Sequence, residues 1–172
     1  MTHDDALIAT ASQTVGPFFH FGLTAQPNGR LVDRLHGDEP ITLVVRVTDG
    51  DGQPVGDAAV EVMQDGVFGR MPTEEDGTCT FETVRPTNAT TKTAAPRAPH
   101  ISVCLFARGL LRHLHTRIYF AGDPAVDRDP VFALVPEHRR ATLLAHPDAA
   151  RPGIWVFELR LQGEGETVFF DD

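Results

Sequence analysis

The sequence predicts an all-β protein: a β-sandwich with an extended N-terminal arm, long loops and one short helix. Its 13 prolines and 15 glycines separate short apolar runs that are rich in β-branched residues, and only one segment has clear helical character. The chain has 172 residues, of which 41% are hydrophobic and 23% are charged. This length and composition indicate one globular domain with a core of its own.

The N-terminal part of the chain is expected to form the arm. The segment PNGRLVDRLHGDEP is polar, rich in turn-forming residues and without sustained hydrophobic periodicity. We therefore predict an arm over residues 1–40 and a β-sandwich domain over residues 41–172.

Strands are predicted where β-branched and aromatic residues cluster. Ile41–Val47, which Pro40 precedes, is the clearest of them. The turn Asp49-Gly50-Asp51-Gly52 follows, and it favours a hairpin with Ala59–Gln64 as the returning strand. Further strands are expected at 79–84, 101–107, 114–121, 154–161 and 167–170.

The single helix is expected in PEHRRATLLAH, residues 136–146. Pro136 and Glu137 suit a helix start, and the following alanines and leucines can form an apolar face. Before it, residues 85–100 form a long loop without periodicity. Long ordered loops in compact domains are often functional, so this loop is a candidate wall of a site.

Charge and composition exclude several classes of partner. The net charge of −9 argues against nucleic acid or an anionic membrane surface. The first ten residues lack the pattern of a signal peptide, and no apolar run approaches the roughly 20 residues that span a bilayer. We interpret Cys79 and Cys104 as small thiols in a reducing compartment rather than as a disulfide. A cytoplasmic location is therefore expected.

Common catalytic motifs are missing from the sequence. It contains no G-x-S-x-G, no G-x-x-x-x-G-K-[ST] and no H-E-x-x-H. Gly163-Glu164-Gly165-Glu166 carries two carboxylates, but we interpret it as a solvated turn rather than as an acid/base pair.

The histidine pair in RHLHTRIYF is the sharpest candidate metal site. On a strand, His113 and His115 point to one face, about 7 Å apart along the chain. A metal needs three or four converging ligands, and no third donor is apparent near His113 in the sequence. From the pattern alone, His113 and His115 are either structural or interface histidines or the ligands of a metal ion.

Longer segments resemble the intradiol ring-cleavage dioxygenase family. LVVRVTDGDGQPVGDAAVEV, from Leu43, followed by Gly69-Arg70-Met71 resembles the signature of that family. SQTVGPFFHFGL, APHISVCLFARG, HLHTRIYF and LQGEGETVFFDD resemble, in the same order, the alpha chains of its two-chain members.

The resemblance implies a shared site in a hetero-oligomer. In these enzymes both chains are β-sandwiches, and each active site lies where an alpha chain meets a beta chain. The beta chain holds a non-haem Fe(III) through two tyrosines, two histidines and a solvent hydroxide. The enzyme cleaves protocatechuate with O2 to 3-carboxy-cis,cis-muconate, and alpha and beta chains assemble as (αβ)n.

The resemblance also implies that this chain does not hold that iron. The positions that match the iron ligands are Met71, residues near Asn88 and Ala89, and His100-x-Ser102, so one ligand of four remains. The only tyrosine in the sequence is Tyr119, which lies at neither tyrosine position. We expect no metal in this chain and an Fe(III) in the beta partner, which leaves His113 and His115 to shape a strand face or a subunit contact.

Four residues are expected to contribute to the pocket of the beta chain. They match family positions at the substrate entrance: Thr14, Gly16 and Pro17 in the arm, and Arg108. A cation at the pocket mouth would orient the carboxylate of protocatechuate. The alternatives are a salt bridge between chains for Arg108 and, for the arm, packing on a neighbouring subunit. The family often has tyrosine where this chain has Phe18.

The alternative function is a stand-alone β-sandwich binding or scaffold protein that has lost catalysis. The enzyme subunit is favoured because SQTVGP, Arg108 and the terminal GEGETVFF persist, and because an isolated domain would not need an N-terminal arm.

Overall fold

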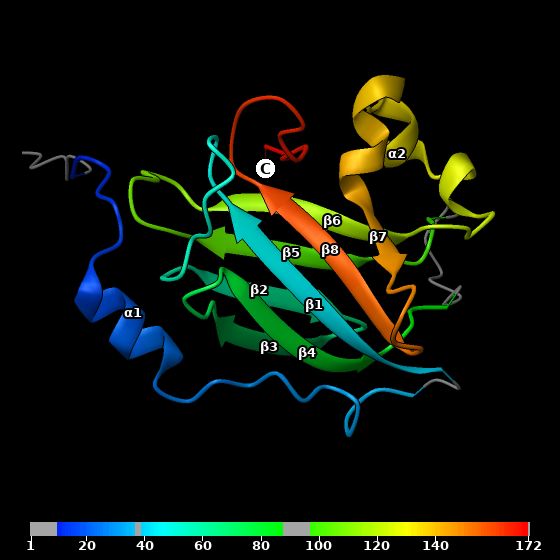
Figure 1. Ribbon diagram of the computed structural model, residues 1–172, viewed down its shortest axis with the longest axis horizontal. Helices are drawn as coiled ribbons and strands as arrows, with labels where there is room; N and C mark the ends of the chain where they lie inside the picture. The colour runs from blue at the N-terminus through cyan, green and yellow to red at the C-terminus, as the bar shows by residue number, and fades with distance from the viewer. Residues whose placement is uncertain (1–9, 37–38, 88–96, 172) are drawn as a thin grey trace, which may run out of the picture.

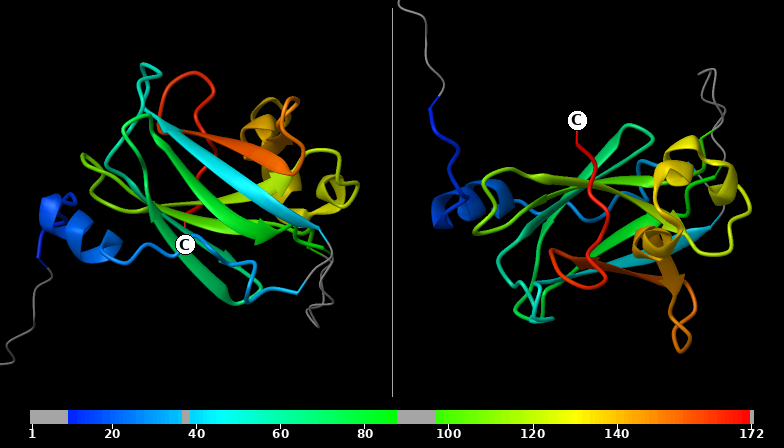
Figure 2. Two further views of the ribbon diagram at one scale, coloured as in Figure 1. Left: turned by 60° about the horizontal axis from the view of Figure 1, so that its bottom comes forward. Right: turned by 90° about the horizontal axis from the view of Figure 1, so that it is seen from above.

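The computed structural model describes residues 10–36, 39–87 and 97–171, which form one strongly curved sheet of eight strands (Figure 1). In chain order the strands are β1 Pro40–Thr48, β2 Ala59–Gln64, β3 Val67–Pro72, β4 Thr78–Val84, β5 Ile101–Phe106, β6 Leu114–Phe120, β7 Leu144–Pro147 and β8 Ile154–Arg160. They lie in the order β3-β2-β5-β6-β7-β8-β1-β4 and pair antiparallel, except that β1–β8 and β6–β7 are parallel. The curved sheet folds over into two facing layers (Figure 2), which confirms the all-β prediction.

The two edges of the sheet are joined by a segment of the predicted arm. Asn28 exchanges two backbone hydrogen bonds with Arg70 on β3, of 2.8 and 3.0 Å, and the Leu31 N–H donates to the Glu82 carbonyl on β4 at 2.8 Å. Gly29 permits this close approach, because a Cβ there would lie 2.8 Å from a β4 carbonyl oxygen. Neither edge therefore presents a long row of unpaired backbone groups to solvent.

The predicted arm divides into two parts. Leu31 and Leu35 are buried in the main core, so the second half of residues 1–40 packs on the chain's own sheet. The first half leads into α1, Pro17–Thr24, which projects away from the sheet (Figure 1). The sequence did not predict this helix, although Pro17 at its first turn suits a helix start.

The predicted hairpin of β1 and β2 is wrong. The Asp49–Gly52 turn does form: the Asp49 carboxylate accepts hydrogen bonds from the Asp51 and Gln53 N–H groups, and Gly52 has a φ of 78°. After the turn, however, the chain crosses to the other layer. There β2 pairs with β3 and β5, while β1 lies between β4 and β8. Local turn chemistry is compatible with both arrangements, and burial of β1 decides between them.

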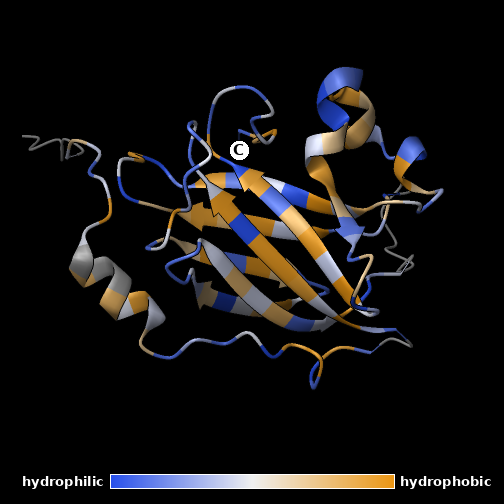
Figure 3. Ribbon diagram, viewed as in Figure 1, coloured by the Kyte–Doolittle hydropathy of each residue, from blue (hydrophilic) through white to orange (hydrophobic). Residues whose placement is uncertain are grey.

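Two hydrophobic clusters lie on opposite faces of β5 and β6. The main cluster fills the space between the layers, where apolar side chains alternate with polar ones along the strands (Figure 3). The second cluster contains Tyr119 and Phe132 and lies under α2, Pro130–Leu134. We call the face of β5–β6 away from the main core the outer face. It carries Ser102, Cys104, Phe106, His113, His115, Arg117 and Tyr119.

The helix predicted over 136–146 is wrong in type and length. Glu137–Leu143 forms a 3-10 helix, and the chain then enters β7, where pairing with β6 and β8 overrides the local helical pattern. A short 3-10 helix, Val126–Arg128, and α2 were not predicted. The predicted strand at 167–170 forms only one bridge, between Phe170 and His115. Strands β3 and β7 were not predicted.

Cys79 and Cys104 are not joined by a disulfide, as expected from the sequence. Cys79 is buried on β4, and burial raises the pKa of its thiol to about 12. Cys104 is half-buried on β5. In the part of the chain that the structure describes, no helix is long and apolar enough to cross a bilayer. Most of the loop predicted as a site wall, residues 88–96, lies outside the described residues.

Candidate functional site

The arm meets the turn between β5 and β6 at one of the predicted pocket residues. The Gly109 N–H donates to the Thr14 hydroxyl oxygen at 2.7 Å, across 95 positions of sequence. Gly109 has a φ of 84°, a left-handed conformation that glycine adopts readily, and Arg108 precedes it. The fold thus brings Thr14 and Arg108 together. Gly16 and Pro17 follow Thr14 at the start of α1.

The side chain of Arg108 is exposed and paired within the chain. Its side chain is 73% exposed, and its Nε contacts a carboxylate oxygen of Asp57. An exposed ion pair of this kind contributes about 0–1 kcal/mol, so it orients Arg108 without fixing it. Arg108 therefore has an ion-pair partner within the chain, while a salt bridge between chains and a part in a substrate pocket both stay predictions.

A shallow pocket separates the arm from the end of β5. Its volume is about 200 Å³, and it is lined by Gln13, Val15, Phe106, Ala107, Leu110, Leu111, Arg112 and His113. Small-molecule sites usually enclose about 300–1,000 Å³. This pocket is smaller and open on one side. By itself it can hold one side chain or part of a ligand.

The arm also exposes large apolar side chains that the sequence did not single out. Phe18 and Phe21 on α1 are 91% and 68% exposed. Their signal in the sequence is the apolar run after Pro17, but only the outward position of α1 shows that they lie in solvent (Figure 1). Exposed aromatic side chains so close together are typical of a surface that another protein covers.

The three positions that match iron ligands do not form a metal site here. Met71 packs against the main core, Ser102 is exposed on the outer face of β5, and His100 is half-buried beside the second cluster. The Nδ1 of His100 lies 2.9 Å from the Ala98 carbonyl oxygen. Burial lowers the pKa of this histidine, so its neutral form is favoured.

Tyr119, the one tyrosine, is held in a buried polar network. Its hydroxyl donates to the Asp129 carboxylate at 3.2 Å, and burial raises its pKa to about 12. Asp129 also accepts hydrogen bonds from the N–H groups of Ala98, Val131 and Phe132. Burial pushes the pKa of Asp129 upward, but these donors outweigh burial and hold it below its usual range. The network caps α2 and anchors the chain before β5.

One group of three metal-binding side chains does converge among the residues described. Candidate donor atoms of Cys104, His113 and His115 all lie within 4.8 Å of one another. Cys104 and His115 are direct cross-strand partners, and the imidazole rings of His113 and His115 lie 4.6 Å apart. No third donor is apparent near His113 in the sequence. Cys104 is that donor, and only the register of β5 and β6 reveals it.

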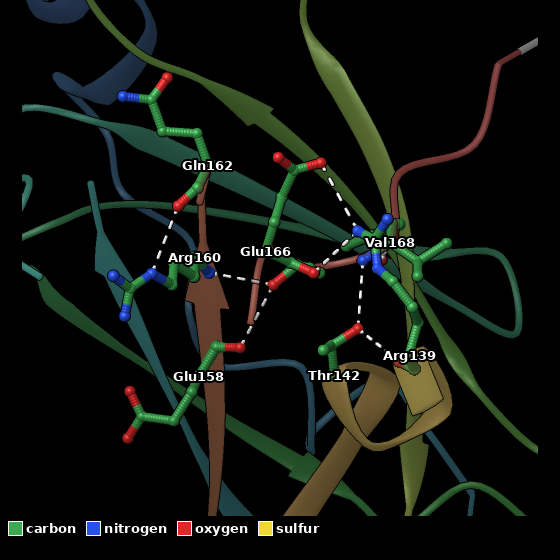
Figure 4. A network of polar contacts seen from close by, with 9 residues as sticks. Arg139, Thr142, Glu158, Arg160, Gln162, Glu166 and Val168 are labelled. Carbon is green, nitrogen blue, oxygen red and sulfur yellow. Dashed lines mark hydrogen bonds and ion pairs between the residues drawn. The ribbon is translucent and has the colours of Figure 1, made fainter. Parts of the chain in front are cut away.

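The acidic turn near the C-terminus, which the sequence predicts to be solvated, is tied to the rest of the fold through Glu166. Glu166 lies beside Arg139, whose guanidinium donates to the Glu166 carbonyl at 2.9 Å (Figure 4). The Thr142 hydroxyl accepts from the Val168 N–H, and the Thr167 hydroxyl accepts from the Arg160 N–H. These bonds fasten the last described segment to β8 and to the 3-10 helix beside it. None of these bonds joins the carboxylates of Glu164 and Glu166.

Comparison with known proteins decides the family. The chain is 42% identical to the protocatechuate 3,4-dioxygenase alpha chain of Burkholderia cepacia, over 94% of this chain and 96% of that one. It is 36% identical to the Pseudomonas putida alpha chain, over 97% and 98% of the two. It belongs to the protocatechuate 3,4-dioxygenase alpha chains, a branch of the intradiol ring-cleavage dioxygenases. No family model matches the sequence.

More distant relatives of this alpha chain are also dioxygenases. It is 30% identical to the protocatechuate 3,4-dioxygenase beta chain of Burkholderia cepacia, over 75% of this chain and 67% of that one. Among solved structures, the dioxygenase domain of a carbohydrate-binding fusion protein from Streptomyces sp. SirexAA-E has a TM-score of 0.63 at 25% identity, covering 80% of this chain and 88% of that one. Hydroxyquinol 1,2-dioxygenase from Pseudomonas putida DLL-E4 has a TM-score of 0.61 at 22% identity, covering 92% and 68%. The fold is that of the intradiol dioxygenases.

Proposed function

We propose that this alpha chain is the iron-free subunit of a hetero-oligomeric enzyme that cleaves protocatechuate with O2 to 3-carboxy-cis,cis-muconate. The observation that carries the proposal is the likeness to two protocatechuate 3,4-dioxygenase alpha chains along nearly the whole sequence. The partner is a beta chain, and the shared site lies where the two chains meet. The likeness to a beta chain supports a common origin of the two subunits.

The donor set of this chain supports an Fe(III) held by the beta chain. A site with two tyrosinate ligands cannot form in a chain whose single tyrosine is buried and bonded to Asp129. Met71 offers only a thioether, which is a poor ligand for ferric iron. His100 is the one matching donor, and it belongs to no converging group among the described residues. The residues do not fit the family's iron, so we assign this chain no chemical step.

The proposed task of this chain is to shape and charge the rim of the beta-chain site. Asp57 contacts Nε of Arg108, and the guanidinium carries further N–H groups on its terminal nitrogens that can bind a carboxylate. The Thr14–Gly109 hydrogen bond supports a rim made by the arm and the β5–β6 turn together. Gly16 and Pro17 continue that rim into α1, whose exposed Phe18 supports packing on the partner.

A cytoplasmic location fits this role. It is supported by Cys79 and Cys104, which remain reduced rather than forming a disulfide.

Co-expression with a beta chain tests the assignment. The chain should elute with its partner. The complex, but not the chain alone, should contain iron, show the tyrosinate-to-iron visible band and take up O2 with protocatechuate. Colour and activity in the isolated chain would contradict the iron-free assignment. Failure to bind any beta chain would favour the stand-alone scaffold.

Arg108→Ala in that complex tests the rim. We expect KM for protocatechuate to rise about tenfold with little change in kcat, because a cation that orients the substrate carboxylate acts mainly in binding. The matched control is Asp57→Asn, which removes the ion pair but keeps the cation. For Asp57→Asn, KM should stay the same or decrease. If both variants only weaken assembly, Arg108 is a structural residue.

A further inference from the structure

We infer that Cys104, His113 and His115 form a binding site for Zn²⁺ on the outer face of β5 and β6. One thiolate and two imidazoles are a donor set that suits zinc, which prefers sulfur and nitrogen ligands in tetrahedral geometry. Three protein donors leave one coordination position, which solvent or a partner side chain fills. The positions that match the family's iron ligands are other residues of the chain, among them Met71, His100 and Ser102.

The strand register creates this arrangement. Cys104 lies directly opposite His115, and His113 lies two residues before His115 on the same face. Side chains directly opposite each other on paired strands have Cβ atoms about 4.5–5.5 Å apart. The three donors therefore occupy the corners of a small triangle on a rigid two-stranded platform. A site built on strands is held more precisely than one built on a loop.

The distances require only side-chain rotation to bind an ion. The donor atoms lie within 4.8 Å of one another, whereas tetrahedral zinc places nitrogen and sulfur donors about 3.3–3.6 Å apart. His113 is exposed, so its ring can turn toward the other two at small cost. The Nε2 atom of His115 is buried, which keeps bulk water away from one side of the site. His113 also lines the pocket beside the arm, which provides an entry path.

The charge around the triangle is mixed: Arg117 lies on the same face beside His115, Arg112 lines the pocket with His113, and one carboxylate lies nearby. Glu61 on β2 is the cross-strand partner of Cys104 on the other side of β5, so a carboxylate lies in the same row as Cys104 and His115. Arg70 holds that carboxylate at 2.7 Å and reduces, but does not remove, its effect. The whole chain carries a net charge of −9. Binding must convert the Cys104 thiol to a thiolate, and the displaced proton goes to solvent.

Metal titration of the full chain, alone and co-purified with its beta chain, tests the site. After treatment with a chelator, the protein should bind about one Zn²⁺ per chain and release about one proton, which calorimetry in buffers of different ionisation heat detects. Co²⁺ in its place should give a thiolate-to-cobalt charge-transfer band and the ligand-field bands of a tetrahedral ion. Zinc should also raise the Tm by several degrees.

Variants separate a built site from surface binding. Cys104→Ser should abolish the charge-transfer band. Cys104→Ser and His113→Gln should each weaken Zn²⁺ binding by more than about 100-fold, because loss of a metal ligand costs at least as much affinity as loss of a residue that only supports a ligand. His113 is exposed, so its variant should fold normally. The controls Cys79→Ala and His146→Gln should bind zinc like the wild type. Binding that is unchanged by Cys104→Ser and His113→Gln, or no cobalt–thiolate band in the wild type, would overturn the proposal.

Discussion

The outer face of β5 and β6 carries a histidine at each end, and the two ends are organised in opposite ways. We call them the His100 end and the His113 end. At the His100 end, α2 covers the sheet and Tyr119 is fully buried. There the Tyr119 hydroxyl, the Asp129 carboxylate and Nδ1 of His100 all have polar partners within the chain. At the His113 end, the arm and the β5–β6 turn leave a pocket, and His113 is exposed beside Cys104 and His115.

The two ends differ because a candidate metal site requires several ligand atoms that converge, and a histidine alone is not enough. The His100 end is the one that matches the family's iron position, yet its one histidine bonds to a backbone carbonyl and faces an aromatic ring. The His113 end matches none of the family's iron-ligand positions, yet it brings together a thiol and two imidazoles. We therefore expect substitutions at the His100 end to change stability and those at the His113 end to change binding.

The largest effect is expected from Asp129→Ala at the His100 end. The change leaves three backbone N–H groups and the Tyr119 hydroxyl without their acceptor and removes the cap of α2. We expect the free energy of unfolding to fall by about 3 kcal/mol, measured by urea denaturation. Asp127→Ala, at an exposed neighbouring position, should change it by less than about 0.5 kcal/mol. A loss from Asp129→Ala no larger than this control would show that the His100 end is not organised by its polar network.

A smaller effect is expected in the pH dependence of stability, through His100. Burial lowers the pKa of His100 in the folded protein, so the unfolded chain takes up the proton first as the pH falls below about 6.5. The free energy of unfolding should therefore decrease as the pH falls from 7 toward the folded pKa of His100. His100→Gln should flatten that decrease, and His146→Gln, at an exposed position, should not. Equal slopes for the wild type and His100→Gln would mean that His100 is solvated.

The smallest effect is expected from Thr14→Val at the His113 end. Loss of the hydrogen bond from Gly109 should cost less than about 1 kcal/mol, because both groups are exposed and water can replace the hydroxyl. The Gly109 amide should nevertheless exchange its hydrogen several-fold faster, measured by NMR. Ser12→Ala, elsewhere in the arm, should leave that rate unchanged. A large loss of global stability would show that the arm is part of the folded core.

The local parts of the fold could be predicted from the sequence, but the pairing could not. The β-branched run before Asp49 and the alternation in Ala59–Gln64 place two strands almost to the residue. The same turn signal predicted a hairpin that does not exist, because turn chemistry is local and the choice of sheet neighbour depends on what each strand buries. In PEHRRATLLAH, the helical pattern was overruled in its last residues by pairing with β6 and β8.

The candidate site divides in the same way. Thr14 and Arg108 were found through their resemblance to a family, while their closeness follows only from the Thr14–Gly109 contact. The sequence indicates only a small thiol at Cys104, because nothing beside it in the sequence points to a metal ligand. Nothing in the sequence around Asp129 marks it as special. Its role as a hydrogen-bond acceptor is visible only in the structure, where four donor groups contact its carboxylate.

The sequence by itself determined that this chain cannot build an iron site with two tyrosines, because the number of tyrosines does not depend on the fold. It also determined the all-β class, since strand-forming periodicity is a property of neighbouring residues. Tertiary structure alone decided that 28–32 closes the sheet, that His100 faces Tyr119, and that Cys104 lies opposite His115. These are contacts between distant segments, and their register is set by burial of the whole core rather than by any local pattern.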